Sequence, residues 1–387
     1  MRSETVYLDY AATTPVDHRV LEAMHPYFSV SFGNPSSVHR WGQKAEAAVE
    51  RSRAHIAQIM GCLPSEIIFT SCGTESDNLA LRGAAYHALK NRGAKHILIP
   101  PVEHHAILHT AQDLAENHGF ELEYLPVDSF GRVKAQELEA RIRPDTAIVS
   151  VMYANNEIGT INPIQTLAQI CRSKHVPFHS DAVQAASQLP IDVNALGVDI
   201  LSIGAHKFYG PKGVGALYVR SGIDLHATQT GGSQEATLRA GTHNVPLIVG
   251  MAKAIEITQS EREIHNHHFE HLRNQILSSV QREIPDVRIS GHPEIRLPNH
   301  ASFVFDGIDG NQLLVALDIA GFGCSSGSAC KTGNPEPSEV LTAIGIEDGW
   351  ALGSLRVTVG RQTTQEDIDS FLQILPTVIS KLRNLNG

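Results

Sequence analysis

The sequence lacks most features of a secreted or membrane-bound protein. It has only five cysteines in 387 residues, an odd number whose spacing fits neither a disulfide framework nor a zinc site. We therefore expect a reducing, cytoplasmic environment. No hydrophobic run approaches the length of a membrane span, and the first residues, MRSETVYLDYAATTP, lack the apolar stretch of a signal peptide.

An excess of basic residues, low-complexity tracts and fixed-period repeats are also absent. Acidic residues outnumber basic ones by 41 to 31, and the formal net charge of −10 has the wrong sign for a nucleic-acid partner. Glycine and proline are scattered, so no linker stands out. What the chain does have is 42% hydrophobic residues, enough for a large core and for two domains.

Hydrophobic periodicity predicts strands and helices that alternate along the chain. Strands are expected at 66–70, 96–100, 146–154, 176–180 and 199–204, and helices at 40–61, 74–93, 104–118 and 163–175. This alternation predicts an α/β fold with a mostly parallel sheet covered by helices.

The pattern changes beyond residue 257. There a long charged helix, strands near 287–290 and 301–305, a helix at 310–320 and a final helix predict a smaller α+β domain. We expect a large domain over 15–256 and a small domain built from 1–14 and 257–387.

Polar residues that follow the predicted strands indicate a ligand site. In parallel sheets, ligands bind beyond the carboxyl ends of the strands. The residues at these positions are Gly73, Thr74, His104, Asn156, Asp181, Gln184, His206 and Lys207.

Two of these residues favour pyridoxal phosphate as the ligand. Lys207, in SIGAHKFYGPKG, follows a hydrophobic strand, where a desolvated lysine can hold an aldehyde cofactor as a Schiff base. A lysine on a surface loop would fit the same pattern. Asp181, in PFHSDAVQAA, would keep the pyridine nitrogen of such a cofactor protonated, and Gln184 would reach its phenolic oxygen.

The segment SCGTESDN would supply the phosphate site. Gly73 and Thr74 stand at a predicted helix start, where free N–H groups and the helix dipole attract an anion. Thr74 and Asp77 also fit a helix-capping pattern that needs no ligand.

Two groups of histidines allow other interpretations. His104, in PVEHHAILH, is placed to stack on a cofactor ring, but it also fits a solvated loop or a metal pair with His105 and His109. Zinc would need more ligands, so we expect no metal. The stretch HNHHFEHLRN (265–274) is expected to be a solvated helix face.

Ten segments, in order, resemble the cysteine desulfurases of the NifS/IscS type. They are LDYAATTP, FGNPSS, TSCGTESDN, VEHHA, NNEIG, HSDAVQ, GAHKFYGPKG, RAGT, SSGSAC and SLRVTVGR. These enzymes belong to the class V aminotransferase family and have the type I pyridoxal phosphate fold. The resemblance extends from Tyr7 to about residue 380. It implies a homodimeric, pyridoxal phosphate-dependent sulfurtransferase that converts L-cysteine to L-alanine.

The resemblance also implies a sulfur acceptor, such as an iron–sulfur scaffold protein or a pathway that sulfurates tRNA or cofactors. Selenocysteine lyases, cystine lyases and aminotransferases of the same family remain alternatives, because they share the cofactor site. The SSGSAC loop separates them, since a transaminase needs no mobile thiol.

By position, the resemblance assigns a role to each site residue. Lys207 would form the Schiff base, Asp181 would pair with the pyridinium, His104 would stack and move protons, and Gln184 would contact the phenolate. The remaining expected contacts are the phosphate ligands Gly73, Thr74, His206 and the other subunit's Thr242, the cofactor contact Asn156, and the substrate-carboxylate clamp Arg356 with Asn34.

The reactive thiol would be Cys330, the last residue of SSGSAC. It lies in a loop, about 323–338, in which Gly327 and Gly333 would let the thiol reach first the substrate and then an acceptor. After Lys207 removes the α-proton, the Cys330 thiolate would attack the substrate sulfur and keep it as a persulfide. Cys324 precedes the motif and is expected to be a small, half-buried packing residue.

Three positions depart from the family pattern. Gly204 and Ala205 replace a Ser or Thr followed by Gly, so a hydroxyl contact to the phosphate is missing. Cys72 replaces a more usual glycine. The chain ends at Gly387, where relatives carry a longer tail that helps bind the scaffold protein, so this partner stays open.

Overall fold

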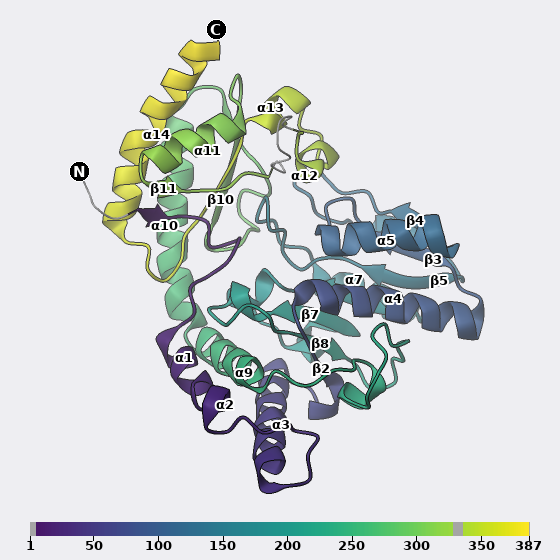
Figure 1. The fold of residues 1–387 in the computed structure, drawn as a ribbon. Helices are drawn as coiled ribbons and strands as arrows, with labels where there is room; N and C mark the ends of the chain where they lie inside the picture. The colour runs from purple at the N-terminus through teal and green to yellow at the C-terminus, as the bar shows by residue number, and fades with distance from the viewer. Residues whose placement is uncertain (1–4, 328–335, 387) are drawn as a thin grey trace.

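A large sheet flanked by helices dominates the computed structural model, which describes residues 5–327 and 336–386 (Figure 1). Its strands, in spatial order, are β2 (Ile67–Thr70), β8 (Gly215–Val219), β7 (Ile200–Gly204), β6 (Phe178–Asp181), β5 (Thr146–Ser150), β3 (His96–Ile99) and β4 (Glu121–Tyr124). All neighbours pair in parallel except β8, which is antiparallel to both β2 and β7. The predicted mostly parallel sheet is confirmed.

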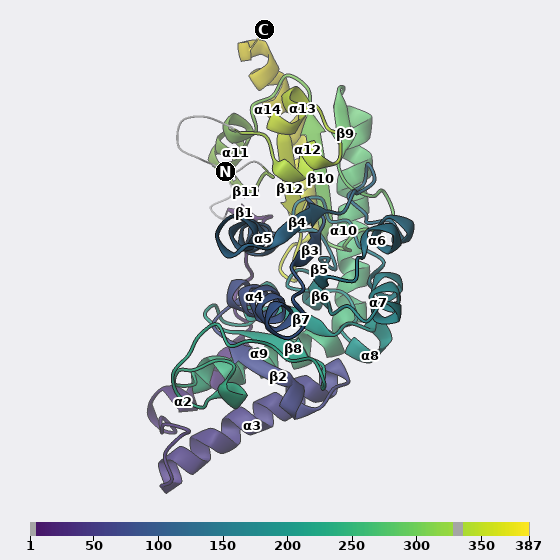
Figure 2. The same cartoon turned by 90° about the vertical axis from the view of Figure 1, so that its right-hand side faces the viewer.

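Helices cover both faces of this sheet, as Figure 2 shows. One face carries α4 (Gly73–Arg92) and α5 (His105–His118), and the other carries α6 (Ala135–Arg141), α7 (Ile164–Ser173) and α8 (Val193–Leu196). Successive strand residues point to opposite faces. Ile97 accordingly joins the core under α4 and α5, whereas Leu98 joins the core on the other side. Burial on both faces explains why these strands are continuously hydrophobic.

A helical layer adjoins the β2 edge of the sheet. It contains α1 (His18–Met24), α2 (Pro26–Ser29), α3 (Arg40–Met60) and α9 (Val245–Ser260). The helix α3 buries Ala45, Val49 and Ile56 and ends at Gly61, whose φ of 71° is a left-handed conformation that glycine adopts without strain. The helix predicted at 40–61 is therefore confirmed.

The rest of the chain packs around two smaller sheets. One joins β12 (Ser354–Thr358), β10 (His300–Phe305) and β9 (Val287–Ile289) in antiparallel order, and the other pairs β1 (Val6–Tyr7) with β11 (Phe322–Gly323) in parallel. Their helices are α10 (Arg262–Glu283), α11 (Gly310–Ile319), α12 (Glu339–Ala343), α13 (Asp348–Leu352) and α14 (Gln365–Asn386). Leu8 shares a core with Phe303 and Phe371, so the N-terminal segment packs with the C-terminal third of the chain.

Two details differ from the sequence-based expectations. The strand predicted over 146–154 ends at Ser150, because the backbone N–H of Met152 turns to the carboxylate of Glu103. The expected boundary between residues 256 and 257 falls inside α9, which continues to Ser260. The two-domain division itself stays a prediction. Among the helices described, none combines the length and hydrophobicity needed to cross a membrane.

Candidate active site

A cavity of about 320 Å³ lies at the carboxyl ends of the large sheet. The predicted site residues that line it are Gly73, Thr74, His104, Asn156, Asp181, Gln184, His206, Lys207 and Arg356. Seven of the nine follow strands of the large sheet, Asp181 ends β6, and Arg356 comes from β12 in the second part of the chain. The structure thus brings together residues that are distant in the sequence.

Lys207 ends a short 3₁₀ turn (Ala205–Lys207) that follows β7 directly. Its Nζ donates hydrogen bonds to the carbonyl oxygens of Ala11, at 2.6 Å, and Ala12, at 2.8 Å. Burial, and then the positive charge of Arg356, lower the pKa of Lys207 to about 8. About one-tenth of this amine is therefore unprotonated at pH 7, far more than for a lysine with the usual pKa.

Asp181 is the last residue of β6 and is buried beside the cavity. Its Oδ1 accepts the backbone N–H of Val183 at 2.8 Å. Burial raises the pKa of Asp181, while the neighbouring His104, the hydrogen bond from Val183 and the Lys207 amine partly offset the rise. A cation bound in the cavity would favour its ionised form.

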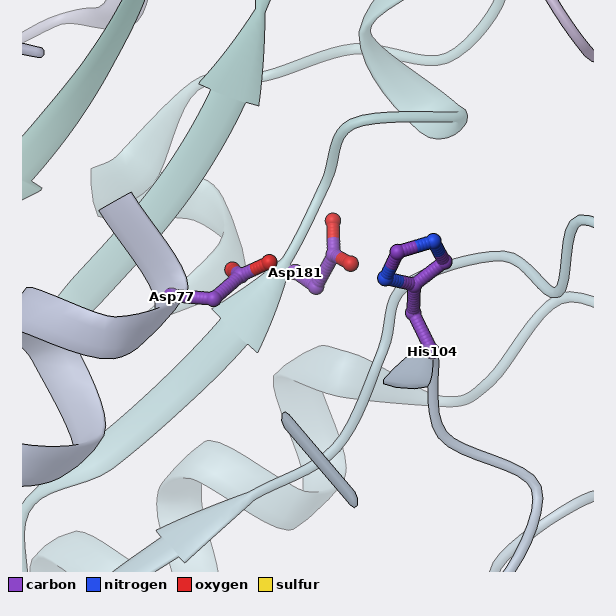
Figure 3. Close-up of side chains that lie close together, drawn as sticks. All are labelled: Asp77, His104 and Asp181. Carbon is purple, nitrogen blue, oxygen red and sulfur yellow. The ribbon is translucent and has the colours of Figure 1, made fainter. Parts of the chain in front are cut away.

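A second carboxyl, that of Asp77, lies close to Asp181 (Figure 3). Asp77 is fully buried on α4, and its Oδ1 has no hydrogen-bond partner among the described residues. Burial, followed by the nearby charge of Asp181, raises its pKa well above the usual range. Ligand atoms of Asp77, Asp181 and His104 lie within 4.8 Å of one another. The sequence identified Asp77 only as part of a cap and missed this position.

His104 is the N-cap of α5, which begins one residue later than predicted. Its Nδ1 accepts the backbone N–H of Ala106 at 3.1 Å, which assigns the ring proton to Nε2. His104 is exposed in the described chain, yet desolvation by the surrounding atoms lowers the pKa of its ring below the usual value. His105 and His109 stack on each other along α5, with ring centroids 4.7 Å apart.

The helix α4 begins at the cavity, but its cap differs from the expected one. The N-cap is Cys72, which makes no side-chain capping bond within the described chain, and the predicted Thr74–Asp77 cap is wrong. Glu75 instead accepts the backbone N–H of Ser71 at 2.7 Å. A Cβ at Gly73 would lie 2.6 Å from a methyl group of Val183, so only glycine allows this close approach.

Arg356 holds its guanidinium between two acceptors. Its Nη1 donates to the carbonyl oxygen of Asn156, and its Nη2 donates to Oδ1 of Asp9, both at 2.9 Å. Its Nε is buried and has no partner in the part of the chain that the structure describes. Because Nε is covered by protein atoms, the N–H groups of Arg356 that remain for a ligand in the cavity are the second ones on Nη1 and Nη2.

The N-terminal segment forms one wall of the cavity, which the sequence analysis did not assign to the site. Ala11 and Ala12 line it, and the Ala11 carbonyl accepts a second hydrogen bond, from Nε2 of Gln184 at 2.7 Å. His206 lies 3.2 Å from Oγ1 of Thr13, and burial, then the nearby lysines, lower its pKa to about 4. The only sequence signal for this wall was the motif LDYAATTP itself.

Three predicted site residues do not line this cavity in the described part of the chain. Thr242 and Asn34 are exposed, and the Asn34 side chain accepts the backbone N–H of Ser36. Cys330 lies outside the described residues. Cys324 is partly buried against the second core, and burial raises the pKa of its thiol, which confirms it as a packing residue.

The histidine-rich stretch 265–274 lies on α10. There His265 contacts Glu261, His268 the carbonyl oxygen of Thr363, and His271 the side chain of Gln365.

The fold and the cavity are those of a known family. Residues 6–371 match the class-V aminotransferases, and the chain belongs to this family. It is 48% identical over 381 residues to cysteine desulfurase IscS of Dictyoglomus turgidum, a match that covers 98% of this chain and 96% of that protein.

Solved structures agree with this assignment. A NifS-like protein superposes with a TM-score of 0.91 at 39% identity, covering 97% of this chain and all of that one. A structure of SspA in complex with cysteine gives a TM-score of 0.80 at 37% identity, covering 92% of this chain and 99% of that one. The fold is the type I fold of pyridoxal phosphate enzymes.

Proposed function

We propose that this chain is a pyridoxal phosphate-dependent cysteine desulfurase that holds the sulfur of L-cysteine as a persulfide on Cys330. The observation that carries this proposal is the convergence of Lys207, Asp181 and Arg356 on one cavity. An amine, a carboxylate and a guanidinium there match the aldehyde, the ring nitrogen and the substrate carboxylate, respectively. The names of the relative from Dictyoglomus turgidum and of the cysteine complex of SspA support the same substrate.

The residues of the cavity fit pyridoxal phosphate. The lowered pKa of Lys207 leaves a free amine for the aldehyde, and Gly73 and Thr74 offer the first N–H groups of α4 to the phosphate. When bound, the cofactor supplies an electron-withdrawing ring that stabilises negative charge on the substrate α-carbon. A metal ion held by Asp77, His104 and Asp181 fits less well, because Lys207 and Arg356 place two positive charges nearby.

The remaining side chains would orient the cofactor and move protons. The neutral His104 ring, with its proton on Nε2, would stack on the cofactor face and exchange a proton with the substrate. The amide of Gln184 uses one N–H on Ala11 and has a second for the phenolic oxygen. Asn156 and His206 line the same cavity and would contact the cofactor and its phosphate.

A second copy of the chain would complete the site. Thr242 is exposed and lies outside the cavity of its own chain, so its contact with the phosphate requires a homodimer. Asn34 is exposed in the same way and would also have to act from the second subunit.

The overall reaction moves one sulfur atom. The Cβ–S bond of L-cysteine breaks, an S–S bond forms with the Cys330 thiol, and the β-carbon gains a proton, giving L-alanine. Lys207, released by the incoming amino group, would remove the α-proton, and Arg356 would hold the carboxylate. A sulfur-acceptor protein, such as an iron–sulfur scaffold, would then take the terminal sulfur.

Mass spectrometry after treatment with L-cysteine tests the proposal. We expect one added sulfur atom on Cys330 and an equivalent amount of L-alanine, with no requirement for a keto acid. Cys330→Ser should keep the visible band of the cofactor but form no persulfide. Cys324→Ser, a matched control, should form it normally, because this cysteine packs against the second core. Normal persulfide formation by Cys330→Ser, or alanine made only with a keto acid, would contradict the proposal.

A further inference from the structure

Asp9 stands next to the arginine proposed to bind the substrate carboxylate. Backbone contacts fix its position, because Asp9 bridges Thr358 in parallel and the Thr358 N–H donates to the carbonyl oxygen of Leu8 at 2.8 Å. The side chain of Arg356, two residues earlier in β12, is only 8% exposed, and that of Asp9 is 17% exposed. The ion pair is therefore largely shielded from water and is held by the sheet.

Three nitrogens of Arg356 meet three different surroundings. Nη2 donates to Oδ1 of Asp9 and Nη1 donates to the Asn156 carbonyl oxygen, whereas Nε is buried without a partner among residues 5–327 and 336–386. A guanidinium is planar, so two anchored nitrogens fix the direction of the third. Nε is covered by protein atoms, so the second N–H groups of Nη1 and Nη2 are the donors left for a ligand in the cavity that Arg356 lines.

We propose that Asp9 is a positioning residue for substrate recognition, which orients Arg356 so that its remaining terminal N–H groups meet the carboxylate of the amino-acid substrate. This inference rests on the proposed function, because it assigns the ligand of Arg356. It goes beyond that function by assigning a role in substrate recognition to a protein carboxylate, that of Asp9. Asp9 never contacts the substrate; it acts only through the guanidinium.

The charge of Asp9 serves the neighbouring amine as well. Arg356 lowers the pKa of Lys207, whereas Asp9 raises it. Asp9 thus offsets part of the decrease that Arg356 causes in the pKa of Lys207. Without this partner, Arg356 would carry an unpaired charge at a largely buried position.

Binding of two amines by the holoenzyme tests the proposal. L-alanine carries an α-carboxylate and ethylamine does not, and both can be followed through the visible absorption of bound pyridoxal phosphate. In Asp9→Asn we expect the apparent Kd for L-alanine to rise on the order of 10- to 100-fold, the range for losing a charged hydrogen bond. The apparent Kd for ethylamine should change much less, because it reports only the effect of Asp9 on the pKa of Lys207, and KM for L-cysteine should rise by a larger factor than kcat falls.

Two further variants separate positioning from folding. Asp9→Glu keeps the charge one methylene further out, so it should weaken L-alanine binding less than Asp9→Asn does. Asp17→Asn is a matched control, since Asp17 also pairs with an arginine, Arg361 at 3.1 Å, but does not line the cavity. It should leave both affinities unchanged.

Unchanged or tighter L-alanine binding in Asp9→Asn, or an equal loss for ethylamine, would overturn the inference. Failure of the proposed function would look different. The wild-type protein would then make no persulfide from L-cysteine, whatever residue stands at position 9.

Discussion

Replacing Glu157 with glutamine tests how a shielded carboxyl makes the stability of this protein depend on pH. Glu157 comes from the segment NNEIG, and its Oε2 accepts the hydroxyl of Ser338 at 2.5 Å. A Cβ on Gly327 would lie 2.6 Å from the same oxygen. Gly327, before segment 328–335, and Ser338, after it, therefore both lie against the Glu157 carboxyl. Burial raises the pKa of Glu157 to about 7, although Ser338 and Arg356 act against the rise.

The size and sign of the effect follow from this pKa. Below pH 4.5 the folded and unfolded states both hold the proton, so Glu157 has no influence. Between pH 4.5 and 7 the unfolded state ionises first, and the free energy of unfolding falls as the pH rises. The full difference in pKa corresponds to about 3 kcal/mol, and partial contact of the side chain with solvent reduces our expectation to about 2 kcal/mol.

Urea unfolding at pH 5 and pH 8 measures this effect. Glutamine keeps an acceptor for Ser338 but does not titrate, so Glu157→Gln should lose less stability than the wild type between these pH values, by about 2 kcal/mol. Glu116→Gln, at an exposed position on α5, is the control and should follow the wild type. An equal pH dependence in Glu157→Gln and wild type would refute the reasoning.

Two further predictions concern Lys207 and a buried ion pair. Because the pKa of Lys207 is about 8, the rate at which the apoprotein binds pyridoxal phosphate should rise with pH up to about pH 8 and then level off. The visible absorbance of the bound cofactor measures this rate. A rate that does not change between pH 6 and pH 9 would contradict the prediction. Burial alone would raise the pKa of Glu235, but the hydrogen bonds and charges of Arg53 and His243 outweigh burial and lower this pKa to about 2. The ionised Glu235 therefore stabilises the folded protein above pH 4.5, and this contribution is lost as the pH falls toward 2. Glu235→Gln should cost about 3 kcal/mol at pH 7, because it leaves the Arg53 charge buried, and an unfolding free energy equal to wild type would count against the pair.

The sequence predicted the parts of the site that depend on local pattern. Strand ends are readable because hydrophobic runs stop abruptly, and in a parallel sheet those ends converge on one edge. Asp181 and Lys207 were found in this way, and both line the cavity. Two strands of the large sheet were missed for physical reasons: β4 (ELEY) is a partly exposed edge with charged residues, and β8 runs antiparallel, outside the strand–helix alternation.

Contacts between residues far apart in the sequence could not be predicted. Asp9 and Arg356 meet because β12 pairs with the N-terminal segment, and no local pattern encodes this pairing. The cap of α4 failed for a different reason: Thr74 has a suitable side chain, but tertiary packing starts the helix at Gly73. Asp77 was therefore interpreted as part of a helix cap, and its burial beside the cavity was not predicted.

The wall formed by residues 9–12 has a consequence for synthesis of the protein. These residues leave the ribosome among the first, yet Ala11 cannot meet Lys207 until more than half of the polypeptide has been translated, and Asp9 cannot meet Arg356 until nearly all of it has been. A nascent chain that stops short of β12 can therefore build the large sheet but not a finished catalytic pocket. The active site is therefore completed only near the end of synthesis, which limits premature reaction of the incomplete enzyme with free amino acids.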